Sequence, residues 1–236
     1  MRVALMQPYF FPYIGYFQLM AACDLFVVFD DAQYIDRGWA NRNRILINGA
    51  AQWITMPVAA SSHKLPFLDR EYLFGDRVAT RLPTRIAGAY KAAPFFRQTM
   101  PLVEEILAFP RPNVAAFNTT LLLKVAARLG IGTPIKRTSE MVKDDSLTGG
   151  ENRVIDICSR LGATTYINPI GGRDLYASGA FADHGIDLRL LSCEAEPYSQ
   201  FGAPYVPFLS IIDVLMFNDV PAVRKMLGQY RLASSR

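Results

Sequence analysis

Three segments follow one another near the start of the chain: Val3-Ala4-Leu5-Met6, then Gln7-Pro8-Tyr9-Phe10-Phe11-Pro12-Tyr13-Ile14-Gly15-Tyr16-Phe17-Gln18, then Leu25-Phe26-Val27-Val28-Phe29. The first and third segments are continuous apolar runs, which are typical of strands buried on both faces of a parallel sheet. The middle segment is an aromatic loop that leads into a short helix, expected over 15–23. Strand, helix and strand within about 30 residues predict a right-handed parallel unit. The aromatic loop is therefore expected at the carboxyl edge of the sheet, where α/β proteins bind ligands.

The rest of the chain continues the alternation of strands and helices. Asn48-Gly49 lies between two β-like runs and predicts an antiparallel hairpin over 44–58, appended to the parallel sheet. Asn113 and Gly130 are the expected caps of a helix over 114–129. Further strands are expected over 134–137, 164–168 and 186–191, and further helices over 151–161, 173–183, 209–217 and 220–228. The middle of the chain is expected to be helical, with Pro83 at a helix start.

These patterns predict a single elaborated α/β domain over residues 1–236. Its core is a Rossmann-like parallel sheet, with an appended β-hairpin and a helical insertion at about 65–130. The 236 residues suffice for a core, and a hydrophobic share of 51% argues against disorder. Neither a membrane span nor a secretory signal is recognisable, so a cytoplasmic location is expected. The sequence does not fix the oligomeric state.

Composition also narrows the chemistry. The net charge of +4 is dispersed and forms no basic ladder for nucleic acid. It suits an anionic small molecule, such as a nucleotide or nucleotide sugar. Cys23, Cys158 and Cys193 show no paired spacing and are expected to be plain buried thiols. The two histidines are too few for a metal site of that type, and no residue is assigned as a metal ligand. Ser139 and Ser210 lack a nucleophile elbow.

Polar residues at the predicted strand ends are the first site candidates. Gln7 follows the first strand, where its amide can contact a base or sugar edge. Gly15 permits close backbone approach, so the helix that it begins can offer N–H groups to a phosphate. Asp30 and Asp31 end the second strand and can hold a ribose, bind Mg²⁺ or act as a general base. The alternatives are that the aromatic loop wedges the helix against the sheet and that one aspartate caps a turn.

Two further loops carry candidate groups. The segment after Asp31 combines guanidinium groups for phosphate or carboxylate, neutral amides and a tryptophan face; its candidates are Gln33, Arg37, Trp39, Asn41, Arg42 and Arg44. The second loop follows the strand at 164–168, and its candidates are Asn168, Gly171, Gly172 and Tyr176. An anion can rest on the amides of Gly172 and Arg173. The structural alternatives are a solvated loop and a tight strand-to-helix turn. Ser210 and Asp213 form a near match to a capping box, although Asp213 can also face the cleft.

Three segments together resemble the WbqC-like family, known from bacterial surface-polysaccharide genes. They are Met6–Tyr16, Asp30–Tyr34 continued through Asn41–Arg44, and Leu209–Asp213; the glycine loop over 168–176 also fits. The resemblance spans nearly the whole chain and implies a role in O-antigen or related glycan assembly. It supplies no set of catalytic residues.

The opening segment also resembles the start of HIGH-superfamily nucleotidyltransferases and pantothenate synthetases. In those proteins two histidines flank a glycine and contact the nucleotide phosphates. Tyr13 and Tyr16 take the corresponding positions around Gly15 here. Tyrosine donates a hydrogen bond but is neutral and cannot replace an imidazolium. The resemblance therefore implies a nucleotide pocket more than adenylyl transfer.

The combined hypothesis is a transferase of surface-polysaccharide biosynthesis, with acyl or aminoacyl transfer to a nucleotide-linked amino sugar. The residues assigned to catalysis are Asp30, Asp31, Arg37, Asn41 and Arg42. The residues assigned to substrate binding are Gln7, Tyr13, Gly15, Tyr16, Gln33, Trp39, Arg44, Asn168, Gly171, Gly172 and Tyr176. The cofactor is left open, with ATP and Mg²⁺ as candidates. The alternative is a protein that binds a nucleotide sugar, or scaffolds glycan assembly, without chemistry.

Overall fold

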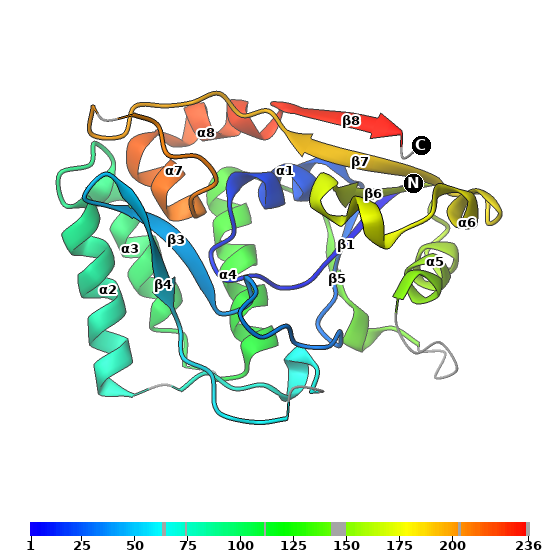
Figure 1. Cartoon of the computed structure of the whole chain (residues 1–236), viewed down its shortest axis with the longest axis horizontal. Coiled ribbons are helices and arrows are strands. Elements are labelled where there is room, and N and C mark those ends of the chain that lie inside the picture. Colours follow the sequence, from blue (N-terminus) through cyan, green and yellow to red (C-terminus); the bar gives the residue numbers. More distant parts are fainter. Residues whose placement is uncertain (63–64, 74, 111, 143–149, 203, 235–236) are drawn as a thin grey trace.

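A six-stranded, mostly parallel sheet lies at the centre of the computed structural model (Figure 1), which describes residues 1–62, 65–73, 75–110, 112–142, 150–202 and 204–234. Its order is β5-β2-β1-β6-β7-β8. The strands are β1 (Arg2–Met6), β2 (Leu25–Val28), β5 (Ile135–Arg137), β6 (Thr165–Pro169), β7 (Asp187–Cys193) and β8 (Tyr230–Ser234). All neighbours are parallel except β7 and β8. From β1 the chain adds β2 on one side and later β6 on the other, so a topological switch point lies between β1 and β6.

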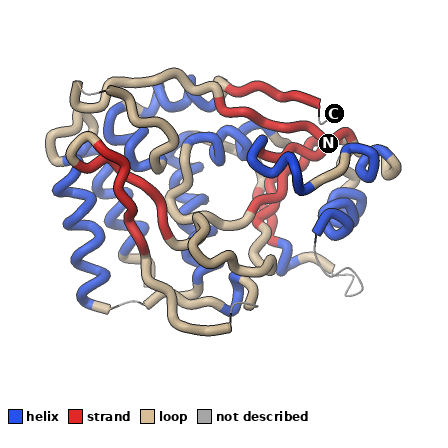
Figure 2. Tube along the Cα trace, viewed as in Figure 1, coloured by secondary structure: helices blue, strands red, loops and turns tan. Residues whose placement is uncertain are grey.

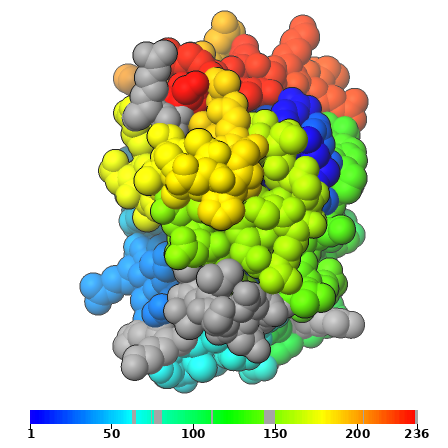
Figure 3. All heavy atoms as spheres, turned by 90° about the vertical axis from the view of Figure 1, so that its right-hand side faces the viewer, coloured from blue at the N-terminus to red at the C-terminus, as the bar shows by residue number. Residues whose placement is uncertain are grey.

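Helices pack on both faces of this sheet (Figure 2). They are α1 (Ile14–Ala22), α2 (Asp76–Tyr90), α3 (Phe96–Leu107), α4 (Val114–Leu129), α5 (Gly150–Arg160), α6 (Ser178–Ala182), α7 (Ile211–Phe217) and α8 (Val220–Leu227). Successive residues of β1 enter different cores because side chains alternate along a strand. Ala4 packs in a core shared with α1, α4, α7 and α8, whereas Val3 and Leu5 pack with α5 and α6. Figure 3 shows the face on which α5 and α6 lie.

Short 3-10 turns complete the connections: η1 (Phe67–Asp69), η2 (Thr138–Glu140) and η3 (Ile170–Leu175). No helix among the described residues is both long and apolar enough to span a membrane.

The predicted parallel strands, the hairpin and the helical insertion are all present. The hairpin consists of β3 (Arg42–Ile47) and β4 (Ala50–Thr55). Asn48 and Gly49 have φ values of 52° and 75°, the left-handed pair that a tight hairpin turn requires. The hairpin forms a two-stranded sheet of its own rather than extending the six-stranded one. Asn113 caps α4 by accepting a hydrogen bond from the Ala116 amide at 2.9 Å.

Two expectations were wrong in detail, and one strand was not expected. Pro83 lies inside α2 rather than at its start, because Leu82, Ile86 and Tyr90 form a buried stripe that outweighs one lost backbone bond. The helix expected over 173–183 is divided into η3 and α6, since Tyr176 has extended backbone angles. The strand β8 was not predicted; it pairs antiparallel with β7 at the edge of the sheet.

Candidate functional site

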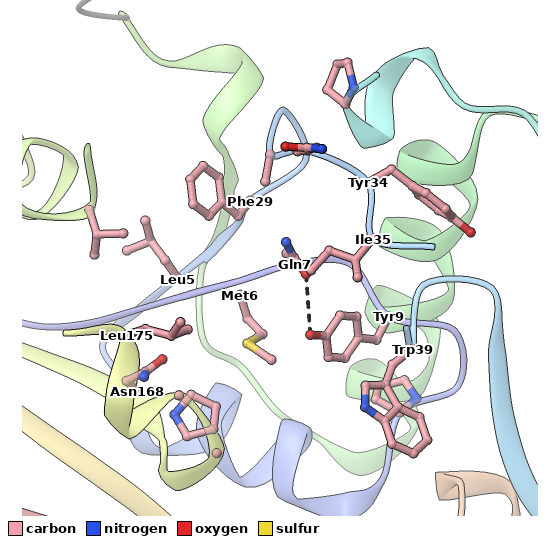
Figure 4. Close-up of a pocket in the computed structure, with 18 of the residues that line it drawn as sticks. Leu5, Met6, Gln7, Tyr9, Phe29, Tyr34, Ile35, Trp39, Asn168 and Leu175 are labelled. Carbon is pink, nitrogen blue, oxygen red and sulfur yellow. Dashed lines mark hydrogen bonds between the residues drawn. The ribbon is translucent and has the colours of Figure 1, made fainter. Parts of the chain in front are cut away.

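A cavity of about 1350 Å³ opens at the carboxyl ends of β1, β2 and β6. The switch point of the sheet therefore coincides with the cavity, as the topology predicts. Figure 4 shows Asn168 and Leu175 on the β6 side, with Tyr34, Ile35 and Trp39 across from them. The polar side chains that line the cavity include those of Gln7, Asp31, Arg44, Arg153 and Asn168.

Residues of the aromatic loop, among them Gln7, Tyr9 and Tyr13, line the cavity. Gln7 follows β1, and its Oε1 lies 3.4 Å from the hydroxyl of Tyr9 (Figure 4). Tyr16 is buried, and its hydroxyl donates to the Gln7 carbonyl at 2.8 Å. A Cβ on Gly15 would lie 2.4 Å from the Tyr13 ring, so the close approach that this glycine permits is made by Tyr13. Tyr13 lines the cavity, whereas Gly15 and Tyr16 do not.

The two aspartates after β2 have different environments. Asp30 is fully buried, and its carboxylate accepts bonds from the Thr138 hydroxyl, the Ser139 amide and the Ser139 hydroxyl at 3.0, 2.9 and 2.7 Å. It therefore ties β2 to η2. Asp31 lines the cavity and accepts from Thr138 at 2.6 Å and from Arg153 at 2.5 Å. Of the pair, only Asp31 lines the cavity.

Guanidinium groups and tryptophan rings form the wall near the hairpin. Arg42 donates to the carbonyls of Arg37 and Gly38 and lies 4.3 Å from the ring centre of Trp53. It therefore fixes the turn before Trp39. Arg44 lies 5.7 Å from the ring centre of Trp39 and lines the cavity with it. Arg37, Asn41 and Arg42 lie outside the lining.

The opposite wall comes from β6 and η3. Asn168 is 4% exposed, and its Nδ2 has no hydrogen-bond partner among the described residues. A Cβ on Gly172 would lie 2.4 Å from that Nδ2, so the glycine makes room for the amide. Gly171 and Tyr176 also line the cavity, and the Tyr176 ring packs edge-on against Phe181.

The cavity thus brings together ten of the sixteen predicted site residues: Gln7, Tyr13, Asp31, Gln33, Trp39, Arg44, Asn168, Gly171, Gly172 and Tyr176. The other six, Gly15, Tyr16, Asp30, Arg37, Asn41 and Arg42, do not line it. Tyr9, Asn43 and Arg153 also line the cavity, although none of them was assigned to the site from the sequence. Asn43 belongs to the polar loop that precedes the predicted hairpin, whereas Arg153 resembles any solvated arginine of an amphipathic helix.

Burial shifts the phenols toward their protonated form. It raises the pKa of Tyr13 and of Tyr34 to about 12 and also raises the pKa of Tyr9. These side chains are therefore neutral hydrogen-bond donors at neutral pH. Burial also raises the pKa of Asp213, which lies outside the cavity and accepts from Tyr90, Tyr198 and Gln200. The described residues include no group of three His, Cys, Asp or Glu side chains arranged to hold a metal ion.

Comparison with known proteins shows that the chain matches a protein family. The model of the WbqC-like protein family matches residues 7–225. The chain is 29% identical over 219 residues to the uncharacterized protein Rv1507c of Mycobacterium tuberculosis, an alignment that covers 92% of this chain and 93% of the relative. No solved structure matches the chain.

Proposed function

Since the chain belongs to the WbqC-like protein family, we propose that it is a transferase of bacterial surface-polysaccharide (O-antigen type) biosynthesis that binds a nucleotide-linked sugar. The observation that carries the proposal is the cavity at the switch point between β1 and β6, lined by amides, guanidinium groups and aromatic rings. Guanidinium groups suit phosphates, amides suit sugar hydroxyls and rings suit a base or a pyranose face. A volume of about 1350 Å³ leaves room for a second reactant beside the sugar nucleotide.

The proposed reaction is acyl or aminoacyl transfer to the amine of a nucleotide-linked amino sugar. The amine nitrogen bonds to the acyl carbon, the leaving group departs with its electron pair, and the amine proton passes to that leaving group. Asp31 faces the cavity between Thr138 and Arg153, which suits it to orient the amine and relay the proton. Arg44 supplies positive charge for the phosphates and for the developing negative charge, and Arg153 holds the Asp31 carboxylate in place.

Purified protein tests the proposal in two steps. Binding is measured by calorimetry against UDP-, dTDP- and GDP-linked sugars, and turnover is then followed by mass spectrometry with acyl and aminoacyl donors, with and without ATP and Mg²⁺. We expect one nucleotide amino sugar to bind and to gain the mass of the acyl group. Failure of every sugar nucleotide to bind would refute the proposal.

Asp31→Asn separates chemistry from binding, and Asp156→Asn is its matched control. Both carboxylates pair with arginines of α5, Asp31 with Arg153 and Asp156 with Arg160, but Asp156 lies outside the cavity. We expect Asp31→Asn to lose turnover by at least about 100-fold while keeping affinity, because general acid–base groups contribute factors of that order. Asp156→Asn is expected to behave as the wild type.

One observation favours a second candidate function, a binding or scaffolding protein that holds a nucleotide sugar without chemistry. Among the five residues predicted to be catalytic, Asp31 alone lines the cavity. In addition, the Tyr16 hydroxyl is taken up by the Gln7 carbonyl. Tight binding of a sugar nucleotide with no turnover for any donor would favour this candidate, and Asp31→Asn would then have no activity to remove.

A further inference from the structure

Positive charge is distributed unevenly over the two walls of the cavity. Arg153 is paired with Asp31 at 2.5 Å, and those side chains are 19% and 4% exposed, so its charge is largely compensated. Arg44 has no carboxylate within ion-pair distance in the part of the chain that the structure describes. Its Nε is buried without a hydrogen-bond partner, and its Nη2 makes one long contact of 3.4 Å to the Phe208 carbonyl. Between the two lining arginines of the described residues, the uncompensated charge is therefore at Arg44.

Two tryptophan rings lie near this guanidinium, with the ring centres of Trp39 and Trp53 at 5.7 and 5.9 Å. Trp39 and Phe208 both line the cavity and are 37% and 61% exposed. Phe208 has a φ of 57°, a strained angle for a residue with a side chain, and its ring packs edge-on against Tyr13. The Ser210 amide donates to the Arg44 carbonyl at 2.8 Å, which links the two segments directly. Rings held open at a cavity mouth can stack on a planar ligand group.

The wall formed by β6 and η3 is neutral among the described residues that line the cavity and holds an unpaired hydrogen-bond donor. Asn168 is more than nine-tenths buried, lines the cavity and has an Nδ2 without a partner. A buried amide N–H is costly unless it meets an acceptor, so this position is suited to a ligand oxygen such as that of a sugar hydroxyl. Gly172 leaves the space that the amide occupies.

We infer that the two walls fix the direction in which the ligand binds. The diphosphate of a nucleotide sugar binds at Arg44, its base lies against Trp39 and Phe208 at the mouth, and its sugar reaches Asn168 and Gln7. This inference rests on the proposed function, and it adds the direction in which the nucleotide sugar lies in the cavity. It does not place the phosphates on the backbone amides at the start of α1, because the Tyr13 ring covers Gly15.

Two variants with opposite expected effects test this direction. Binding is measured by calorimetry for nucleoside diphosphates without a sugar (UDP, dTDP and GDP) and for the corresponding nucleotide sugars. Arg44→Gln should weaken both ligand types by at least about tenfold, because it removes charge-assisted hydrogen bonds to phosphate. Asn168→Ala should weaken the nucleotide sugar about three- to tenfold and leave the sugar-free nucleotide within twofold.

Controls separate the possible failures. Arg189→Gln removes an exposed arginine that pairs with Asp187 outside the cavity and should bind as the wild type does. Arg44→Lys retains the charge and should keep part of the affinity, and circular dichroism checks that each variant is folded. If the wild type binds and Arg44→Gln binds equally well, or if Asn168→Ala weakens both ligand types equally, the inference is overturned while the proposed function stands. If the wild type binds neither ligand type, both are overturned.

Discussion

Replacing Gly172 with alanine tests whether the missing side chain is what positions the Asn168 amide. An ideal Cβ on Gly172 lies 2.4 Å from Nδ2, 3.2 Å from Cγ and 3.3 Å from Oδ1 of Asn168. Since real contacts of a Cβ stay beyond 3.0 Å, the amide nitrogen must retreat by about 0.6 Å. The backbone at Gly172 is not in the left-handed region, so this contact is the main cost of the substitution.

Gly171→Ala is the matched control, because its added Cβ would meet no heavy atom within 4 Å. Alanine for glycine at a compatible position stabilises a protein by about 0.4–1 kcal/mol through the unfolded chain. In a chain of this length that raises Tm by roughly 1–4 °C. Gly172→Ala gains the same contribution and loses it to the contact with Asn168, so its Tm should be equal to or below that of the wild type.

The same pair of variants separates stability from binding. Moving the Asn168 amide forfeits one ligand hydrogen bond of about 0.5–1.5 kcal/mol, which weakens affinity by about 2- to 12-fold. Differential scanning fluorimetry gives Tm, and calorimetry with the nucleotide sugar gives Kd. The reasoning is refuted if Gly172→Ala is as stabilising as Gly171→Ala and binds the nucleotide sugar as the wild type does.

Three further predictions concern the core. Asn118→Ala should lower the free energy of unfolding by about 2–4 kcal/mol in urea titrations, since the fully buried amide donates to the carbonyls of Pro8 and Ala40 at 2.8 and 2.7 Å; a loss below about 0.5 kcal/mol would contradict it. Burial raises the pKa of Asp213 above its ordinary value of 3.8, so the native state binds the proton more tightly than the unfolded chain does. The free energy of unfolding should therefore fall as pH rises from 3.8 through the raised pKa. Asp213→Asn should flatten this part of the plot of unfolding free energy against pH, and an unchanged slope would count against the assignment. Burial raises the pKa of Cys23 and Cys158 to about 12, so both thiols should resist Ellman's reagent at pH 8 until the protein unfolds, and rapid native labelling of either would be the contrary result.

Sequence patterns predicted the elements that are determined by residues close together in the sequence. The Asn48-Gly49 turn, the Asn113 cap and the uninterrupted apolar run of β2 each follow from neighbouring residues. The edge strand β8 could not be recognised, because its five residues gain their structure from pairing with β7. Pro83 was misplaced for a related reason, since the buried stripe around it, and not the proline, decides where α2 lies.

The residues of the candidate site show the same difference between local and long-range causes. Gln7 and Asn168 were predictable because each ends a strand of the parallel sheet, and parallel strands end at one edge. Arg153 was not predictable, because only the packing of α5 against the sheet brings it to Asp31, 122 positions earlier in the sequence. The Asp30 and Asp31 pair shows the limit most clearly. The two residues are chemically identical in the sequence, and contacts from η2 and α5 decide that Asp30 is enclosed and that Asp31 lines the cavity.

The aromatic loop owes its position to the hairpin as much as to the sheet. Asn43 donates to the carbonyls of Phe10 and Phe11 at 3.2 and 2.9 Å, and the Phe10 amide donates to the Trp39 carbonyl at 2.9 Å. The Ser210 hydroxyl donates to the same Phe11 carbonyl at 2.8 Å. Phe11 has a φ of 40°, an angle that persists only where such surrounding bonds hold it. The loop after β1 and the start of α7 are therefore joined to the hairpin in one hydrogen-bonded wall, and Arg44 projects from that wall into the cavity. A ligand held by Arg44 would consequently gain from the rigidity of three segments that are distant in the sequence.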